Sequence, residues 1–208
     1  MSESETATKP RRLTSRGAAT RARILEAAAE LIRAKGVAAT TLDEVRAASA
    51  TSKSQLYHHF PDKEALVHEV ISLQARAVLD HHGQQLQRLS SIRGLERWRD
   101  AVVQRTSLIR GAYGCALGSL VSELADTDEE ARVLLQDNFM TWEGLLVDGF
   151  ERMRASGELR PDADPVTLAT GTMAALQGGY LLAQMARNGT PMEVALDMAI
   201  DHVKSYAA

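Results

Sequence analysis

Apolar residues recur along this chain at spacings of three and four, which is the period of an amphipathic α-helix. The first such stripe starts after Thr20 and consists of Ile24, Leu25, Ala28, Leu31 and Ile32. Lys35-Gly36 then places a cation in a last helical turn and a glycine directly behind it, which is typical of a helix C-terminus. The pattern predicts a helix over residues 20–35.

Two short helices follow, and each begins with a capping box, in which a hydroxyl residue precedes Glu or Gln by three positions. Thr41 and Glu44 form the first box, and Ser52 and Gln55 form the second. Only three or four residues separate the two helices. Two short capped helices behind a longer amphipathic one are typical of a helix-turn-helix, whose second helix enters the DNA major groove.

The rest of the chain keeps the helical period. Phe60-Pro61 ends the second short helix, and Asp62 begins a longer one that reaches about His82. Five more helices are predicted, over 91–110, 115–125, 129–155, 165–187 and 191–206, the last with Thr190 as its N-cap. No segment shows the sustained alternation of a β-strand. The sequence therefore predicts an all-α fold of about nine helices.

The formal net charge of −3 conceals an uneven distribution. Residues 1–60 carry ten Lys/Arg and six Asp/Glu, whereas residues 61–208 carry fourteen and twenty-one. The segment 9–23 holds six cations and no acid. A basic end beside an acidic body favours contact with a polyanion, although a solubilising tail would have the same composition. Residues 1–19 are predicted to form a disordered basic arm.

Composition argues against several other classes of protein. Apolar residues make up 45% and charged residues 25% of the 208 residues, as in an ordinary globular protein. The single cysteine, Cys115, permits no intramolecular disulfide and fits a reducing compartment. No uncharged apolar run reaches the roughly 18 residues of a membrane span, and the N-terminus lacks the apolar core of a signal peptide. We expect a cytoplasmic protein without membrane contact.

The segment from Thr20 to Val67 strongly resembles the DNA-binding domain of the TetR family of bacterial transcriptional regulators. The resemblance rests on Ile24-Leu25-x-Ala27-Ala28, Lys35-Gly36, Thr40-Thr41, Leu56-Tyr57-x-His59-Phe60 and Lys63-Glu64-x-Leu66, in the family's order and spacing. It implies a helix-turn-helix domain over 20–80 and a helical ligand-binding and dimerisation domain over 81–208. It further implies a ligand-released repressor that acts as a homodimer on a palindromic double-stranded DNA operator.

Phosphate contacts position such a protein on DNA without specifying sequence. Thr41 lies at a helix N-terminus, where a hydroxyl and free N–H groups suit a phosphate. Tyr57 and Lys63 match the tyrosine and the lysine with which the family contacts the DNA backbone. Arg21 is expected to add salt-dependent attraction or to enter the minor groove, together with the arm residues Arg11, Arg12 and Arg16.

Base contacts are expected from the second short helix, which opens with the polar turn Ser52-Lys53-Ser54-Gln55. Lys53 suits guanine O6 and N7, Gln55 suits adenine N6 and N7, and Ser54 and His58 are further candidates. Two alternatives stay open at this stage. Tyr57 could be a core aromatic residue, and His58 could be a solvated or packed imidazole.

One residue departs from the family's pattern. The turn before the second short helix usually contains glycine where this chain has Ala50. If Ala50 adopts a positive φ, it costs on the order of 1 kcal/mol, but the turn could be built without a left-handed residue. A further resemblance links Gly114–Leu120 to a GCPxGSL-like stretch in a subgroup of drug- and flavonoid-responsive repressors.

The resemblance also places a small lipophilic or aromatic effector in the helical body. Candidate lining residues are Trp98, Tyr113, Phe139, Trp142, Met173, Leu176 and Tyr180, with Met140 and Met185 as further apolar side chains. Ordinary core packing would explain the same residues. The last two helices are expected to form a four-helix interface with a second copy, in which small residues allow close approach, namely Gly171, Gly178 and Gly179.

Three alternative interpretations can be compared with this one. An enzyme is the rival class, but the sequence contains no HExxH, CxxC, GxSxG or P-loop motif, and we expect no cofactor and no metal. Cys115 could be a redox sensor, because a thiol near a helix start can have a lowered pKa, or it could be a small buried side chain. A TetR-like factor without any small-molecule inducer is the third.

Overall fold

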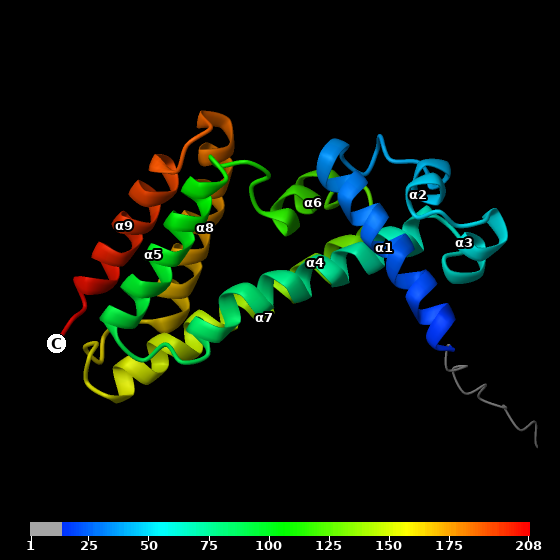
Figure 1. Ribbon diagram of the computed structural model, residues 1–208. Coiled ribbons are helices and arrows are strands. Elements are labelled where there is room, and N and C mark those ends of the chain that lie inside the picture. Colours follow the sequence, from blue (N-terminus) through cyan, green and yellow to red (C-terminus); the bar gives the residue numbers. More distant parts are fainter. Residues whose placement is uncertain (1–13) are drawn as a thin grey trace, which may run out of the picture.

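The computed structural model of the protein describes residues 14–208 (Figure 1). These residues form nine helices, so the predicted all-α fold is confirmed. Within the described part of the chain, the sole β pairing is a bridge between Leu159 and Ala207. The helices are α1 (Ser15–Lys35), α2 (Leu42–Ala48), α3 (Lys53–His59), α4 (Lys63–Leu86), α5 (Ile92–Leu108), α6 (Ala116–Leu124), α7 (Glu129–Ala155), α8 (Pro165–Ala186) and α9 (Thr190–Lys204).

Helix α1 begins at Ser15 rather than near Thr20. Its N-cap, Thr14, accepts a hydrogen bond from the Gly17 N–H at 3.2 Å. The predicted disorder of the N-terminal arm is therefore wrong from Ser15 onwards, because a local cap starts the helix before its apolar stripe begins. Arg16 consequently lies exposed on the first turn of α1. The predicted arm residues that lie outside the described part of the chain are Arg11 and Arg12.

Helix α4 continues past its predicted end near His82 and runs through Gly83 to Leu86. The periodicity suggested a stop because glycine is a poor helix residue. Gly83 is buried, however, and a Cβ built on it would lie 4.0 Å from Leu145 Cδ1 on α7. The burial of Leu86 against the core outweighs the roughly 1 kcal/mol that a glycine costs inside a helix.

The start of α9 also differs from its prediction. Thr190 is not the N-cap but the first helical residue, and its N–H donates to Asn188 Oδ1 at 3.0 Å. Gly189 holds the N-cap position without a side-chain hydrogen bond. A Cβ on Gly189 would collide with Ser107 of α5, so close packing against α5 decides which residue occupies this position.

The helices form an elongated molecule with two distinct ends (Figure 1). Helices α4 and α7 lie side by side and parallel along its length, since His68 meets Asp128 at one end and Leu86 meets Arg152 at the other. Helices α1, α2 and α3 surround the beginning of α4, whereas α5, α8 and α9 form a bundle at the opposite end, and α6 lies between. No helix within residues 14–208 is both long enough and apolar enough to cross a membrane.

A histidine is buried where α4 meets the bundle. The side chain of His82 is 3% exposed, and its Nδ1 accepts a hydrogen bond from Trp98 Nε1 at 3.2 Å. The ring centroids of His82 and Trp142 are 4.8 Å apart. Desolvation, with smaller effects from His81 and Arg105, lowers the pKa of His82 to about 3. His82 is therefore neutral at pH 7 and carries its proton on Nε2.

We expect this buried histidine to weaken the fold as the pH falls. The unfolded chain binds the proton near the ordinary pKa of 6.5 and the folded chain only near 3, so the unfolded state holds more protons between these values. The free energy of unfolding should fall by up to about 1.4 kcal/mol per pH unit below about pH 6.5. Urea unfolding of the wild type between about pH 7 and pH 5 measures this slope.

The matched variant is His82→Asn, whose amide oxygen can still accept from Trp98 but which does not titrate. Its stability should depend less on pH than that of the wild type over the same range. An identical slope in the two proteins would mean that other groups carry the pH dependence.

Candidate nucleic-acid interface

Helices α2 and α3 pack against α1 as a helix-turn-helix, and both predicted capping boxes are present. The Glu44 N–H donates to Thr41 Oγ1 at 3.3 Å, and the Thr41 N–H donates to Glu44 Oε2 at 3.0 Å. In the second box, the Gln55 N–H donates to Ser52 Oγ at 3.2 Å, and the Ser52 N–H donates to Gln55 Oε1 at 2.9 Å. These local bonds determine where each short helix begins.

The turn between α2 and α3 is a Schellman motif in which Ala50 is left-handed, with φ of 50°. The Thr51 N–H donates to the Arg46 carbonyl at 3.1 Å, and the Ala50 N–H donates to the Ala47 carbonyl at 3.2 Å. Helix α7 ends with the same pair of bonds, but there Gly157 is the left-handed residue. The sequence left open whether this turn contains a left-handed residue. It does, and Ala50 therefore adopts the conformation with the higher energetic cost.

Helix α3 turns its polar residues outward. Lys53, Ser54, Gln55 and His58 are exposed, and the side chain of Leu56 is buried and anchors the helix. Tyr57 is 46% exposed, so it is a surface residue rather than the core aromatic residue of the alternative interpretation. Exposure leaves these polar side chains accessible to a partner, which a packed core position would not.

The surface of α3 continues into neighbouring elements. Lys53 Nζ lies 5.9 Å from the centroid of the Tyr57 ring, one helical turn further along. The N-caps Ser52 and Thr41, also predicted DNA contacts, are both exposed. The structure therefore places the cations, hydroxyls and amide predicted on α3 and its cap on one accessible element.

Gln55 and Thr41, both predicted DNA contacts, form side-chain hydrogen bonds within their own capping boxes. Gln55 Oε1 is occupied by the Ser52 N–H of the capping box. The hydroxyl of Thr41 donates to Glu44 Oε2 at 2.8 Å. A hydrogen bond from Lys35 at 2.5 Å, together with those from Thr41, lowers the pKa of Glu44 to about 2 and keeps this cap ionised. A base or phosphate that binds here has to compete with the caps.

The predicted phosphate-contacting cations differ in how free their charges are. Lys63 Nζ lies 3.5 Å from the Ala38 carbonyl oxygen and pairs with no carboxylate within residues 14–208. Arg21 pairs with Glu69 of α4 at 2.6 Å and lies 5.2 Å from the centroid of the Phe60 ring. Arg21 therefore braces α1 against α4, a role that sequence reasoning missed because Glu69 lies far along the chain.

A cavity of about 350 Å³ lies in the helical body, between α4, α5, α7, α8 and the loop before α6. Three of the seven predicted lining residues meet there, namely Tyr113, Trp142 and Tyr180. The other four do not line it, because they serve as packing side chains; these are Trp98, Phe139, Met173 and Leu176. Met140 and Met185 point to solvent, with exposed fractions of 60% and 75%.

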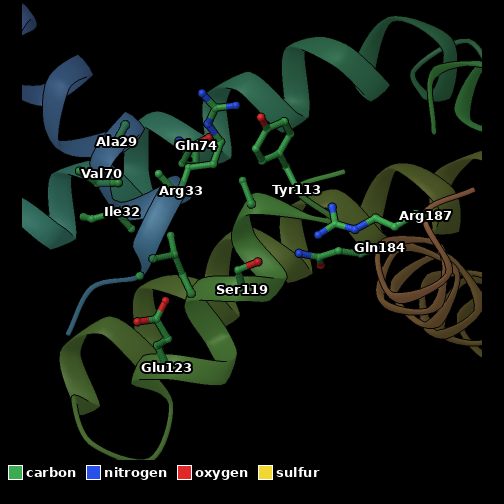
Figure 2. Close-up of a pocket in the computed structure, with 14 residues that line it drawn as sticks. Ala29, Ile32, Arg33, Val70, Gln74, Tyr113, Ser119, Glu123, Gln184 and Arg187 are labelled. Carbon is green, nitrogen blue, oxygen red and sulfur yellow. The ribbon is translucent and has the colours of Figure 1, made fainter. Parts of the chain in front are cut away.

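A second cavity of about 350 Å³ adjoins the first at the junction of α1, α4 and α6 (Figure 2). Arg33, Gln74 and Tyr113 line both cavities. Two contacts join the helical body to the end of α1 here. The guanidinium carbon of Arg33 lies 4.6 Å from the centroid of the Tyr113 ring, and Glu123 of α6 accepts a hydrogen bond from the Val37 N–H at 2.6 Å.

Cys115 is the N-cap of α6, and its sulfur accepts a hydrogen bond from the Gly118 N–H at 3.4 Å. Burial raises the pKa of this thiol, and the hydrogen bonds that it accepts offset the effect only in part. The lowered pKa on which the redox-sensor hypothesis depends is therefore not found. A buried, neutral thiol that caps a helix fits the geometry instead.

Two family models match this chain, one over each end of the molecule. The model described as "Bacterial regulatory proteins, tetR family" matches residues 24–70, and "Tetracyclin repressor-like, C-terminal domain" matches residues 85–199. The chain belongs to the TetR family. It is a DNA-binding transcriptional regulator, and the helix-turn-helix of α2 and α3 lies within the matched DNA-binding region.

Relatives of this TetR-family regulator extend over most of its length. The "Transcriptional regulator AcuR" of Cereibacter sphaeroides is 28% identical, with 88% of this chain and 87% of the relative covered. The "HTH-type transcriptional repressor DhaR" of Mycobacterium sp. is 24% identical, with 87% and 90% covered. A crystal structure of a TetR transcriptional regulator from Chloroflexus aurantiacus has the same fold, with a TM-score of 0.81, 22% identity, and 93% and 98% covered. Both curated relatives are named as transcriptional regulators.

The left-handed alanine in this TetR-type turn leads to a stability prediction. Ala50→Gly should raise the free energy of unfolding by about 0.5–1 kcal/mol, because the relief of left-handed strain exceeds the extra freedom that glycine gives the unfolded chain. Urea unfolding at pH 7 measures the change. Ala48→Gly, inside α2, is the control and should destabilise instead. A loss of stability in Ala50→Gly would show that the turn carries no strain at this residue.

Proposed function

We propose that this TetR-family regulator is a homodimeric repressor that a small lipophilic or aromatic effector releases from a palindromic operator. The observation that carries the proposal is the polar, solvent-exposed face of α3, anchored from behind by Leu56. In this mechanism α3 enters the major groove with its first turn leading. Lys53 then binds guanine O6 and N7, and Ser54 and His58 contact neighbouring bases.

Gln55 is proposed to bind adenine N6 and N7. A bidentate contact needs both atoms of its amide group, but Gln55 Oε1 holds the Ser52 N–H in the free protein. Base recognition therefore exchanges one hydrogen bond for another at this position. That exchange reduces the net gain from adenine and penalises bases that cannot replace the lost cap bond.

Phosphate contacts are assigned to residues around the ends of α2, α3 and α4. Thr41 and Lys63 lie at the starts of α2 and α4, and Tyr57 projects from the exposed side of α3. Arg21 contributes less than a free arginine would, because Glu69 already compensates its charge. Lys63 is consequently the cation in this set whose loss should be felt most.

The homodimer is proposed to form through α8 and α9. Helix α8 exposes Leu181 and Met185 to the extent of 67% and 75%, and α9 exposes Val194 and Met198 to the extent of 52% and 71%. On α8, a Cβ built on Gly178 would meet no atom within 4 Å. A stripe of exposed apolar and small residues allows two copies to approach closely, and a two-fold dimer places two recognition helices about one DNA turn apart.

Effector release is proposed to act through α4. This helix starts beside the helix-turn-helix at Lys63 and reaches the cavity with Val78 and His82. The proposed division into a DNA-binding domain over 20–80 and an effector-binding domain over 81–208 falls within it. An effector needs only to favour the arrangement in which the two recognition helices no longer match the operator.

Binding measurements can separate base recognition from phosphate contact. Against an operator selected from random duplexes, Gln55→Ala should lose roughly 1–3 kcal/mol of binding free energy while scrambled DNA loses little. Lys63→Ala should weaken both duplexes by the same factor and lower the slope of log affinity against log salt by about 1. Arg88→Ala, an exposed cation on the helical body, is the control and should change neither. Equal losses on both duplexes for Gln55→Ala would falsify its role in base recognition.

Sedimentation tests the proposed dimer. Leu181→Arg should convert a micromolar dimer into monomer, because the interface would have to bury an unpaired guanidinium. The helical circular dichroism should not change, since Leu181 is exposed within the single chain. Val133→Arg replaces an exposed apolar residue of α7 and should leave the dimer intact. A monomeric wild type at micromolar concentration would remove the basis of the proposal.

A further inference from the structure

The cavity beside Trp142 has an apolar interior. Its deepest lining residues include Trp142, Thr106 and Cys115, which are 0%, 2% and 8% exposed, and Tyr180 adds a second aromatic ring. The His82 ring, also in the wall, is 4.8 Å from the Trp142 ring, so flat rings make up much of this end. Its volume of about 350 Å³ is within the range of cavities that hold small organic ligands. An aromatic body matches the chemistry of such a wall.

The other end of the cavity is exposed and carries charge of one sign. Arg33 and Arg105 line it, and no aspartate or glutamate does. Neither arginine forms an ion pair with a carboxylate anywhere in residues 14–208. Arg105 Nη1 instead donates to His81 Nδ1 at 3.2 Å. Two arginines at a cavity mouth without a carboxylate leave positions for an anion, and a planar carboxylate matches the guanidinium fork.

The histidines of the cavity do not add to this charge. Burial and the nearby Arg105 lower the pKa of His81, and the pKa of His82 is lowered as described above. Both rings are therefore neutral near pH 7. The charged side chains of the lining are then the two arginines alone. The cavity combines an aromatic interior with a cationic mouth.

Arg33 also connects this mouth to the DNA-binding end. It belongs to α1, whose inner face packs against α2, α3 and α4, and its guanidinium lies over the Tyr113 ring. A cation–π contact at an exposed site is weak, and a charge-assisted hydrogen bond to a carboxylate is stronger. An anion at the mouth would therefore draw Arg33 away from Tyr113 and act on α1 directly.

We propose that the effector of this regulator is an aromatic carboxylate, whose ring packs against Trp142 and Tyr180 and whose carboxylate is bound by Arg105 and Arg33. The proposal rests on the ligand-responsive repressor proposed above and names the chemical class of its effector. It assigns Arg105 to affinity and Arg33 to both affinity and the transfer of the signal to α1.

The test compares acids with their neutral amides. Titration calorimetry on the full-length protein uses benzoate, 4-hydroxycinnamate and 2-naphthoate beside benzamide, 4-hydroxycinnamamide and 2-naphthamide. At least one acid should bind tenfold or more tightly than its amide, which is what one charge-assisted hydrogen bond provides. Arg105→Gln should reduce this preference, because only Arg33 remains to bind the carboxylate. Arg93→Gln, which changes an exposed residue of the same helix that does not line the cavity, should keep it.

The signalling role of Arg33 needs a second measurement, the release of a labelled operator followed by fluorescence anisotropy. Arg33→Gln should still bind the acid, at reduced affinity, but release less operator when saturated. Full release by the saturated variant would overturn the assignment of Arg33. Unchanged operator binding and circular dichroism without ligand would establish that both variants are folded.

The outcomes also separate this inference from the proposed function. Equal binding of acids and amides, or a preference that Arg105→Gln leaves unchanged, would overturn the proposed carboxylate effector while leaving the proposed repressor unaffected. Amides that bind the protein and cause it to release the operator would likewise overturn the proposed carboxylate. If no acid of the panel binds at millimolar concentration, the proposal that the effector is an aromatic carboxylate is wrong. If the protein fails to bind a selected operator at all, the proposed function fails first.

Discussion

Helix α4 has to be buried at both of its ends, and this requirement links the two halves of the molecule. Near its start, Val70 and Ile71 are fully buried, and this end of α4 packs against α1. Near its end, His82 and Leu86 are buried between α5 and α7, and Arg152 donates to the Leu86 carbonyl at 3.2 Å. Because packed interiors do not deform gradually, a displacement at the cavity end has to move α4 as a body or be resisted. The same helix therefore joins the two halves of the molecule and is the proposed route of the effector signal.

Some charged side chains of this protein form ion pairs between helices, and others are cations without a carboxylate partner among the described residues. Arg21 with Glu69 and Lys35 with Glu44 join neighbouring helices of the DNA-binding end. Lys53 and Lys63 have no carboxylate partner in the described part of the chain, and Arg33 and Arg105 face a cavity without acids. An ion pair with a carboxylate compensates the charge of an arginine, whereas an arginine without such a partner can bind an external anion. These four cations lie at the surface assigned to DNA and at the cavity assigned to the effector.

Helix α8 brings the effector cavity and the proposed dimer face within one residue of each other. Tyr180 lines the cavity, while its neighbour Leu181 is 67% exposed on the outer side of the helix. Cys115 and Gly118 of α6 lie against the same stretch of α8. In the proposed dimer, a change in the cavity can therefore alter the spacing of the two copies as well as the position of α4. Both effects would change the distance between the two recognition helices, which has to match the spacing of the half-sites in a palindromic operator.

The sequence by itself determined what depends on neighbours within a turn or two. Apolar periodicity predicted the positions of the helices. The capping boxes of Thr41 and Ser52 predicted where α2 and α3 begin, because their hydrogen bonds join residues only three positions apart. Tertiary structure decided the rest. The pairing of Arg21 with Glu69 and the extension of α4 past Gly83 each depend on residues that are distant in sequence, which local pattern does not encode. Trp98 and Leu176 are core residues that do not line the cavity, whereas Trp142 and Tyr180 do line it. Local sequence does not predict this difference, because helices distant in sequence decide whether the space beside an apolar side chain is filled.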